Sequence, residues 1–395
     1  MSELSEGPET VAPQINTPLA QKIKALIRQQ QPWSISSYMA ACLNDPEHGY
    51  YRSQAAIGAG ADFTTAPEIS QVFGELVGIW AAITWRAMGA PPAFDLVELG
   101  PGRGTLMQDA LRAGSVVPGF VAAARIHLIE QNPTLAAQQK LALAAYAGCT
   151  DWHEECCVLT YVSEADEQTR WIKSIAPGPT IIIANEFLDT MPVNQWIARN
   201  GKWHSRGIEV DGDNLSFIEL DTWDRNSVGD PPLAPPQPDG AIWQSTEAAW
   251  QYASMLSRRA ATGPLAALFF DYGFENAAAG DTLQAMSEHR YVSPLRAPGL
   301  DDLTAHVDFG DMAQHFRSVG LLVDGPITQT EFLLKMGLVE RAQALMREAR
   351  ADQVNAIETG ARRIADPDGM GGLFKVMAVR SPGVPVLPPF SREGH

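Results

Sequence analysis

The sequence is 395 residues long and carries 46 acidic against 29 basic side chains, a net charge of −17 at neutral pH. This excess of negative charge disfavours nucleic acid and anionic membrane surfaces as partners. The 45% hydrophobic and 19% charged residues are typical of a folded protein, which at about 150 residues per domain would form one large domain or a few small ones.

The sequence has no pattern for membrane insertion, targeting or metal binding. No apolar run approaches the ~18 residues that a membrane span needs, and the acidic start shows neither a signal-peptide nor a transit-peptide pattern. Four cysteines are too few for a disulfide scaffold, and the adjacent Cys156 and Cys157, close to His153, are not spaced as ligands of one metal ion. We therefore expect no membrane insertion, no metal site and a reducing compartment such as the cytoplasm.

The first part of the chain is predicted to be mainly helical. Residues 1–16 form a polar leader, and 17–90 a helical cap in which apolar side chains recur at helical spacing. A stretch rich in glycine, proline and acidic residues interrupts the cap at 44–68, and a second apolar helix is expected at about 69–88. Two helical stretches on either side of a long loop should therefore precede any sheet.

From residue 91 onward, short apolar runs alternate with helical segments, a pattern typical of βαβ units on a parallel sheet. The expected strands are 94–99, 125–130, 180–186, 265–272 and 374–380. The expected helices are 105–113, 133–147 and about 330–365. Thr105 and Gln108 have the spacing of a capping box at the start of the first helix. The predicted fold class is α/β, with a mostly parallel sheet in a domain that spans 91–395.

Residues 193–240 break this rhythm. Two expected strands flank Asn200-Gly201, a pair that favours a type I′ hairpin turn because both central residues need a positive φ. A third strand follows, and the proline-rich stretch 229–238 is expected to be a stiff connector. The expected strands are 195–199, 202–210 and 215–220. We interpret this region as an antiparallel β insertion in the sheet domain.

The sharpest motif is the glycine-rich stretch Glu98–Thr105, which begins in the last two residues of the first expected strand. Glycines let the backbone approach a ligand, and a helix N-terminus offers unpaired N–H groups. A dinucleotide fingerprint would need a glycine at Thr105, and an acid such as Glu98 does not suit a pyrophosphate. An acid here suits a positively charged ligand, such as the methionine part of S-adenosylmethionine (SAM). We therefore predict a cofactor site at Glu98, Gly100, Gly102 and Gly104; a tight turn without a ligand is the alternative.

Later strand ends add polar groups to the same predicted crevice, because the carboxyl ends of parallel strands share one edge of a sheet. Glu130, 30 residues after Gly100, has a carboxylate that can accept both ribose hydroxyls, or it can be a helix N-cap. Asn185 and Glu186 end the next expected strand, where a transferred methyl group would lie. Asp271-Tyr272-Gly273 ends a further strand at the same edge, or is a simple turn.

These motifs together resemble the MidA-like SAM-dependent methyltransferase family, from about residue 17 to 380. The sequence departs from the family pattern at Ala61 and at Gln131-Asn132, two places where local loop geometry can differ. The resemblance implies a class I methyltransferase fold, with a Rossmann-like sheet, an N-terminal helical region and an antiparallel β insertion. Besides the glycine turn, it rests on Gly49-Tyr50-Tyr51, Asp62–Glu68, Ala184–Asp189, Asp271–Gly273, Pro298–Phe309, Thr328-Gln329 and Met370–Lys375.

The resemblance also implies a cofactor, a partner and a location. The glycine turn, Glu130 and the 62–68 loop, with Asp62 and Thr65, would surround SAM, and Asn185 would contribute from its strand end. Mitochondrial members of the family are complex I assembly factors that methylate protein arginine. The implied acceptor here is an arginine of a quinone-reductase subunit like the 49-kDa subunit of complex I. Since no transit pattern is seen, the bacterial cytoplasm is favoured over the mitochondrial matrix.

Glu186 is the candidate catalytic carboxylate, and Asp189 is a weaker second one. A carboxylate paired with a guanidinium can orient one nitrogen for in-line attack on a methyl group. His289 and His306 are candidates to line the acceptor site, although a lone histidine is more often structural.

Two other functions stay open. One is a methyltransferase that acts on a small molecule or a carboxylate, and the other is an assembly chaperone that binds SAM without turnover. A nicotinamide oxidoreductase is disfavoured by Thr105 and Glu98. The oligomeric state, and whether an arginine would be methylated once or twice, do not follow from the sequence.

Overall fold

A computed structural model describes most of the chain, in two compact units. Five residues named above, Ala61, Asp62, Cys156, Cys157 and His289, lie outside the described residues, as does most of the proline-rich connector. The first unit consists of the described parts of 13–52, 194–244 and 280–305, and the second of those of 65–193, 245–275 and 306–390. The described ranges are 13–30, 32–52, 65–153, 172, 175–220, 238–275, 280–287 and 290–390.

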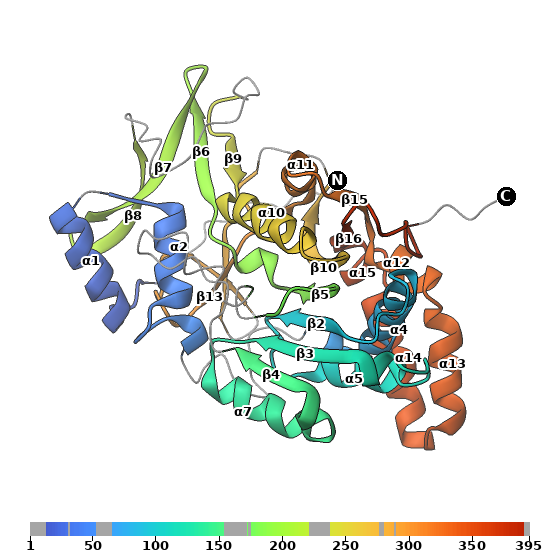
Figure 1. The fold of residues 1–395 in the computed structure, drawn as a ribbon. Helices are drawn as coiled ribbons and strands as arrows, with labels where there is room; N and C mark the ends of the chain where they lie inside the picture. The colour runs from blue at the N-terminus through green and yellow to red at the C-terminus, as the bar shows by residue number, and fades with distance from the viewer. Residues whose placement is uncertain are drawn as a thin grey trace. The chain divides into compact units, whose positions relative to one another are not determined.

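The second unit is built on an eight-stranded sheet with the order β15-β16-β10-β5-β2-β3-β4, and β14 pairs with β10 (Figure 1). β16 runs antiparallel to both neighbours, whereas the ladders between β4, β3, β2, β5 and β10 are parallel. The strands are β2 (Phe94–Leu99), β3 (Ala124–Ile129), β4 (Thr150–His153), β5 (Thr180–Asn185), β10 (Leu265–Phe274), β14 (Val307–Asp308), β15 (Leu322–Thr328) and β16 (Phe374–Arg380). The predicted α/β fold with a mostly parallel sheet is confirmed.

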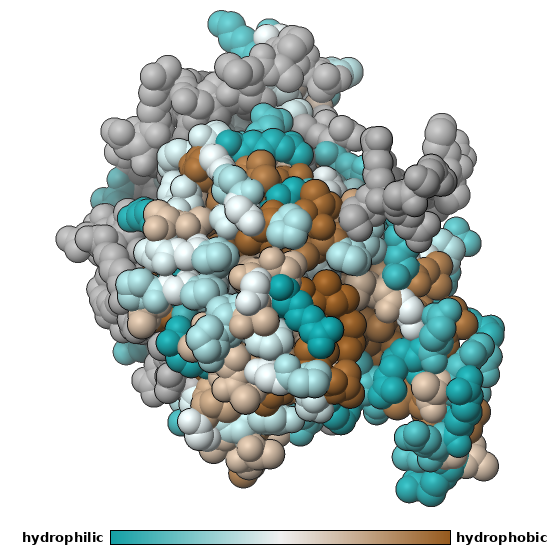
Figure 2. Space-filling model, turned by 45° about the vertical axis from the view of Figure 1, so that its right-hand side comes forward, coloured by the Kyte–Doolittle hydropathy of each residue, from teal (hydrophilic) through white to brown (hydrophobic). Residues whose placement is uncertain are grey.

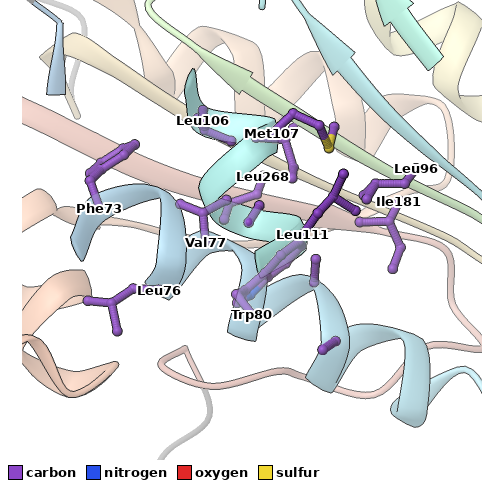
Figure 3. Packing of buried hydrophobic residues seen from close by; sticks show 14 of the residues in the cluster. Phe73, Leu76, Val77, Trp80, Leu96, Leu106, Met107, Leu111, Ile181 and Leu268 are labelled. Atoms are coloured by element: carbon purple, nitrogen blue, oxygen red, sulfur yellow. The ribbon is translucent and has the colours of Figure 1, made fainter. Parts of the chain in front are cut away.

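Helices cover both faces of this sheet. One face packs against α4 (Gln71–Ala87), α5 (Thr105–Gly114), α12 (Gln329–Lys335), α13 (Leu338–Glu348) and α14 (Ala351–Ile364), and the other against α10 (Glu247–Ala260) and α11 (Phe309–Ser318). Successive side chains of a strand point to opposite faces. Leu96 and Ile181 therefore lie in the first core with Trp80 and Leu111 (Figure 3), while Val97 lies in the second.

Helices α4 and α5 pack against each other without an intervening side chain at Gly78. A Cβ atom at Gly78 would collide with the backbone of Ala110 on α5. Because α5 follows the glycine turn directly, this packing fixes the position of the turn. α4, which was expected within the N-terminal helical region, thus packs in the sheet unit.

The capping box predicted at the start of α5 is wrong. The N-cap is Gly104, which has no side chain and a left-handed backbone, so Thr105 is already the first helical residue. The Thr105 hydroxyl instead donates to Glu68 Oε1 (2.6 Å), and Gln108 Nε2 donates to the carbonyl of Ala142 (2.8 Å). A side-chain cap is present on α7 (Pro133–Ala142), where Asn132 Oδ1 accepts from the N–H of Thr134 (2.9 Å). The helix expected at 133–147 is shorter in the structure: α7 ends at Ala142, and a 3₁₀ helix, η3 (Ala144–Cys149), follows it.

The first unit combines two helices with two antiparallel sheets. β6 and β7 form the predicted hairpin, and its turn residues Asn200 and Gly201 have φ values of +50° and +70°. The helices are α1 (Pro18–Gln30) and α2 (Ile35–Asn44). The larger sheet holds β1 (Trp33–Ser34), β6 (Asn194–Arg199), β7 (Lys202–Asp211), β8 (Asn214–Leu220) and β9 (Ile242–Ser245), and the smaller holds β11 (Gln284–Ser287), β12 (Arg290–Val292) and β13 (Asp302–Thr304).

The surface drawn in Figure 2 mixes hydrophobic patches with hydrophilic side chains. Apolar side chains that remain exposed in the sheet unit include Leu334, Val339 and Leu373. Scattered exposure of this kind is normal for a folded protein. Within the described ranges, none of the helices combines the length and the apolar character that crossing a bilayer demands.

One buried ion-pair cluster lies at the start of β2. Asp95 is 1% exposed, and its carboxylate accepts from Arg125 Nε (2.8 Å), His127 Nε2 (2.9 Å) and Arg259 Nη2 (2.6 Å). The Arg259 side chain is itself only 3% exposed. Removing one partner of a buried pair leaves the other charge uncompensated. Asp95 therefore ties β2 to β3 and to the end of α10.

Asp95→Ala is expected to lower the free energy of unfolding by about 3–5 kcal/mol, because the Arg259 guanidinium loses its counter-charge. Urea denaturation followed by circular dichroism measures this change. The matched control is Asp352→Ala, which removes an exposed carboxylate paired with Arg350 and should leave the midpoint unchanged. Equal midpoints for the two variants would contradict a structural role for the cluster.

Candidate active site

The glycine turn between β2 and α5 has space for a ligand at one of its three glycines. Gly100, Gly102 and Gly104 have φ values of +63°, +54° and +83°, which glycine adopts far more readily than other residues. A Cβ atom at Gly100 would lie 3.0 Å from the ring of Phe187, and one at Gly104 would lie 3.3 Å from Gln139 Cγ. A Cβ atom at Gly102 would meet nothing within 4 Å. The turn is thus packed at its two ends and open at its centre.

Two carboxylates lie beside this turn. Glu98 is 3% exposed, and burial, together with the nearby carboxylate of Glu130, raises the pKa of Glu98 to about 8. Glu130 accepts from the backbone N–H of Asn132 through Oε1 (2.8 Å) and from Gln139 Nε2 through Oε2 (3.3 Å). A site with two close acidic groups repels an anion and stabilises a cation. The sequence-based preference for a positively charged ligand over a pyrophosphate agrees with this geometry.

Gln139 is a site residue that the sequence pattern does not reveal. It is fully buried on α7, and its Nε2 donates to the carbonyl of Gly102 (2.7 Å) as well as to Glu130. A glutamine in a helix normally indicates a solvated face, and only the packing of α7 against the turn buries this one. Gln139 therefore connects the open centre of the turn to the acidic end of β3.

Glu186 follows β5 in an unusual backbone conformation. Its φ is +50°, which is uncommon for a residue with a side chain and is often found at functional sites. Its N–H donates to the carbonyl of Phe270 (2.9 Å), and its Oε1 accepts from Asn185 Nδ2 and from the N–H of Ala66 (both 3.3 Å). Burial and the carboxylate of Asp189 raise the pKa of Glu186 to about 7. The group can thus gain or lose a proton near neutral pH.

Asp189 and Asp271 bring two further carboxylates to this edge of the sheet. Asp189 is 5% exposed and accepts from the Tyr272 hydroxyl (2.6 Å). Burial raises the pKa of Asp189 to about 6, although the Tyr272 hydroxyl opposes that shift. Asp271 is fully buried; burial and the carboxylates of Asp189 and Glu186 raise its pKa, and backbone N–H groups oppose the rise. β5 and β10 are paired in parallel, so their carboxyl ends carry these groups side by side.

The segment that begins at Thr65 is tied to both parts of the site. Thr65 precedes the short helix α3 (Ala66–Ile69), and its side chain makes no capping bond. The N–H of Ala66 donates to Glu186, while Glu68 pairs with Arg103 of the glycine turn. The ring of His306 meets Tyr272 edge-on, with 5.4 Å between the ring centroids. Burial lowers the pKa of His306.

Several buried oxygen atoms in these residues lack a hydrogen-bond partner. Buried polar atoms are normally paired, so unpaired acceptors indicate a ligand that donates hydrogen bonds or carries positive charge. Among the described residues, such acceptors at this edge are Glu98 Oε2, Gln139 Oε1, Asn185 Oδ1 and Asp189 Oδ1. The oxygens of Glu98 and Gln139 lie in the glycine-turn part of the site. Those of Asn185 and Asp189 lie at the carboxyl end of β5 and in the turn that follows it. The arrangement fits a positively charged ligand at the glycine turn and a second positively charged reactant at the end of β5.

Comparisons with known proteins agree with this description. Residues 76–327 match a family described as "Putative S-adenosyl-L-methionine-dependent methyltransferase". The chain is similar to the mitochondrial protein arginine methyltransferase NDUFAF7 homolog of Drosophila melanogaster, with 34% identity over 385 residues, 93% of this chain and 85% of that protein. It is 31% identical over 385 residues to human mitochondrial protein arginine methyltransferase NDUFAF7, covering 92% of this chain and 83% of that protein.

The fold is also similar to a solved structure. A protein from Burkholderia thailandensis, crystallised with S-adenosyl-homocysteine, matches with a TM-score of 0.77 and 24% sequence identity. The match covers 96% of this chain and 98% of that protein. At this level of identity the likeness concerns the fold.

Proposed function

Since this chain belongs to the family of SAM-dependent methyltransferases, we propose that it methylates an arginine side chain of a protein. The observation that carries the proposal is the pair of carboxylates, Glu186 and Asp189, on the turn that follows β5. The names of the relatives, protein arginine methyltransferases at 31–34% identity, support the same acceptor. SAM binding and the choice of acceptor would involve different residues of the site.

The residues around the glycine turn fit SAM. Glu98 would hold the cationic methionine end, and Glu130 would accept from the ribose hydroxyls; the open centre at Gly102 leaves room for close approach. Gln139 would add an acceptor through its unpaired Oε1, and Asn185 another through Oδ1. When bound, SAM supplies a methyl group on a positively charged sulfur.

The carboxylates at the end of β5 suit a guanidinium acceptor. Glu186 would accept hydrogen bonds from the guanidinium, orient one nitrogen toward the methyl group, and concentrate the positive charge on the other nitrogens. Asp189 would pair with the same cation from the side held by Tyr272. The arginine proton would leave only as the methyl group is transferred and would pass to the carboxylate of Glu186 or Asp189, so these groups need not be strong bases. A carboxylate substrate would meet two like charges here, which favours arginine over an acidic small molecule.

We propose an arginine of a quinone-reductase subunit like the 49-kDa subunit of complex I as the acceptor, following the family resemblance. The relatives carry the word mitochondrial in their names. The family resemblance supports this acceptor.

The intact mass of the candidate subunit, compared between wild-type cells and cells that lack the gene, tests the acceptor. We expect wild-type protein to be heavier by about 14 daltons, or a multiple of it, per methylated site. Purified enzyme and tritium-labelled SAM, added together to a lysate of the deletion strain, identify other acceptors: label in an alkali-stable protein linkage supports arginine. Label only in small molecules, or in an alkali-labile linkage, would overturn the arginine assignment.

SAM binding is expected to release a proton near pH 7. The Glu98 carboxyl has a pKa of about 8, so at pH 7 it is mostly protonated, and a cationic ligand favours its ionised form. The affinity for SAM should therefore rise as the pH is raised from 6 toward 8, and level off above that value. Calorimetry at pH 7 in phosphate and in Tris, whose ionisation enthalpies differ, measures the released proton. Glu98→Gln should abolish the difference between buffers; an equal heat in both buffers for the wild type would contradict the assignment.

A further inference from the structure

The carboxylate of Asp271 holds the turn that carries Glu186 and Asp189. Its Oδ2 accepts from three consecutive backbone N–H groups, those of Phe187 (3.1 Å), Leu188 (2.8 Å) and Asp189 (3.2 Å). Its Oδ1 accepts from the N–H of Tyr272 (3.0 Å). These bonds join β10 to a turn that lies more than 80 residues earlier in the chain. One side chain thus replaces the hydrogen bonds that the turn cannot make within itself.

Asp271 is not placed to touch a substrate. It is 0% exposed, and both of its oxygens already accept backbone N–H groups. Glu186, by contrast, is partly exposed, and Asp189 has one oxygen without a partner. Any influence of Asp271 on the reaction must therefore pass through the turn.

The turn needs an external support because of its backbone. Glu186 has a φ of +50°, a conformation that persists for a residue with a side chain only where its surroundings enforce it. The three N–H groups bound by Asp271 follow Glu186 directly, and the N–H of Glu186 itself is bound by the carbonyl of Phe270. The end of β10 therefore bonds four successive N–H groups, from Glu186 to Asp189.

We propose that Asp271 is a positioning residue for methyl transfer, which fixes the 186–189 turn so that the Glu186 and Asp189 carboxylates face the acceptor in one arrangement. This inference rests on the proposed function and names a residue that acts through the two carboxylates. The adjacent Tyr272 supports the same turn, because its hydroxyl donates to the side chain of Asp189. Strand β10 would thus orient one proposed carboxylate through the backbone and the other through a hydroxyl.

Variants at Asp271 test the proposal in an assay of tritiated methyl transfer from SAM to proteins in a lysate of the deletion strain. Asp271→Ala should slow transfer at saturating SAM about 100-fold, and the KM for SAM should change less than about threefold, because a misplaced group costs rate more than binding. Asp271→Asn keeps one acceptor oxygen and should lose only about tenfold. The matched control is Asp324→Asn, which removes a carboxylate charge paired with Arg380 at the sheet edge and should retain the wild-type rate.

A combined variant separates positioning from general stability. If Asp271 acts through Glu186 and Asp189, adding Asp271→Asn to the variant with Glu186→Gln and Asp189→Asn should change its rate less than about threefold. Independent losses that multiply, or an Asp271→Ala enzyme with the wild-type rate, would overturn the proposal. An Asp271→Ala enzyme whose KM for SAM rises by the same factor as its rate falls would also overturn the proposal.

Amide hydrogen exchange distinguishes failure of this inference from failure of the proposed function. With S-adenosyl-homocysteine present, the N–H groups of residues 187–189 should exchange faster in Asp271→Asn than in the wild type. In Asp324→Asn their exchange rates should equal those of the wild type. Unchanged exchange at 187–189 would overturn the anchoring whatever the enzyme methylates. If exchange changes as expected but the wild-type enzyme labels no protein, the arginine proposal fails while the anchoring of the turn holds.

Discussion

Replacing Glu186 with glutamine is expected to slow methyl transfer about a hundred- to a thousandfold, while the affinity for SAM stays within about threefold. Glutamine has nearly the same shape but carries no charge, so it can no longer pair with a guanidinium. The bonds from Asn185 and from the N–H of Ala66 need only an acceptor oxygen, which the amide retains. The loss should therefore fall on turnover.

Two measurements check this expectation. Calorimetry gives the affinity for SAM, and incorporation of label into protein from the deletion strain gives the rate. The control is Glu358→Gln, which removes an exposed carboxylate of α14 that pairs with Arg362. Turnover by Glu186→Gln at the wild-type rate would remove this residue from the mechanism. A large loss of SAM affinity would instead make it a cofactor ligand.

The pH dependence of the wild-type rate gives a further check on Glu186. The pKa of about 7 means that the carboxyl is mostly protonated at pH 6 and mostly ionised at pH 8. Only the ionised form pairs with a cation, so the rate at saturating SAM should rise with pH through about 7. Burial raises the pKa of Asp189 to about 6, so ionisation of Asp189 adds to the same rise in rate. In Glu186→Gln the rise near pH 7 should disappear.

Gly102→Val is expected to abolish measurable SAM binding, a loss of at least about 100-fold in affinity. Gly102 is the glycine of the turn where a side chain would meet nothing within 4 Å, and it has a φ of +54°. A valine there would fill the open centre, and its branched side chain disfavours the left-handed backbone. Both effects act at the point where the backbone would approach the cofactor.

A control glycine separates the two effects. Gly320 also has a positive φ, +86°, and open space around it, but it lies in the loop before β15. Gly320→Val should cost about 1–2 kcal/mol in backbone strain, as Gly102→Val should, but it should leave the affinity for SAM unchanged. Titration calorimetry with SAM checks both variants. If Gly102→Val binds SAM like the wild type, the glycine turn is not the cofactor site; if it loses SAM but still supports assembly of its partner, the chaperone function gains.

Much of the sheet could be predicted because its strands are short, buried and strongly apolar. The expected 94–99 and 374–380 strands agree with β2 and β16, and the hairpin at Asn200-Gly201 follows from the backbone that those two residues favour. The capping box failed because a local pattern competed with the glycine turn, which places Gly104 at the N-cap. Local signals succeed where burial and turn chemistry agree.

The candidate site could be predicted only where its residues end a strand. Glu98, Glu130 and Glu186 are visible in this way, because an acid after an apolar run is a local signal. Asp271 also ends an expected strand, but its bonds to the 186–189 turn depend on β10 pairing with β5. Gln139 is not visible, since its role depends on α7 packing against the glycine turn. The raised pKa values likewise come from burial by distant segments.

The first unit is assembled from three separated stretches of the polypeptide, and the last of these ends at residue 305. During synthesis, α1, α2 and the hairpin emerge from the ribosome well before β11–β13 exist. The second unit likewise waits for β16, which lies between β10 and β15. Neither unit can therefore complete its folding on a nascent chain until most of the message has been translated, and early intermediates would carry unpaired strand edges that favour chaperone binding.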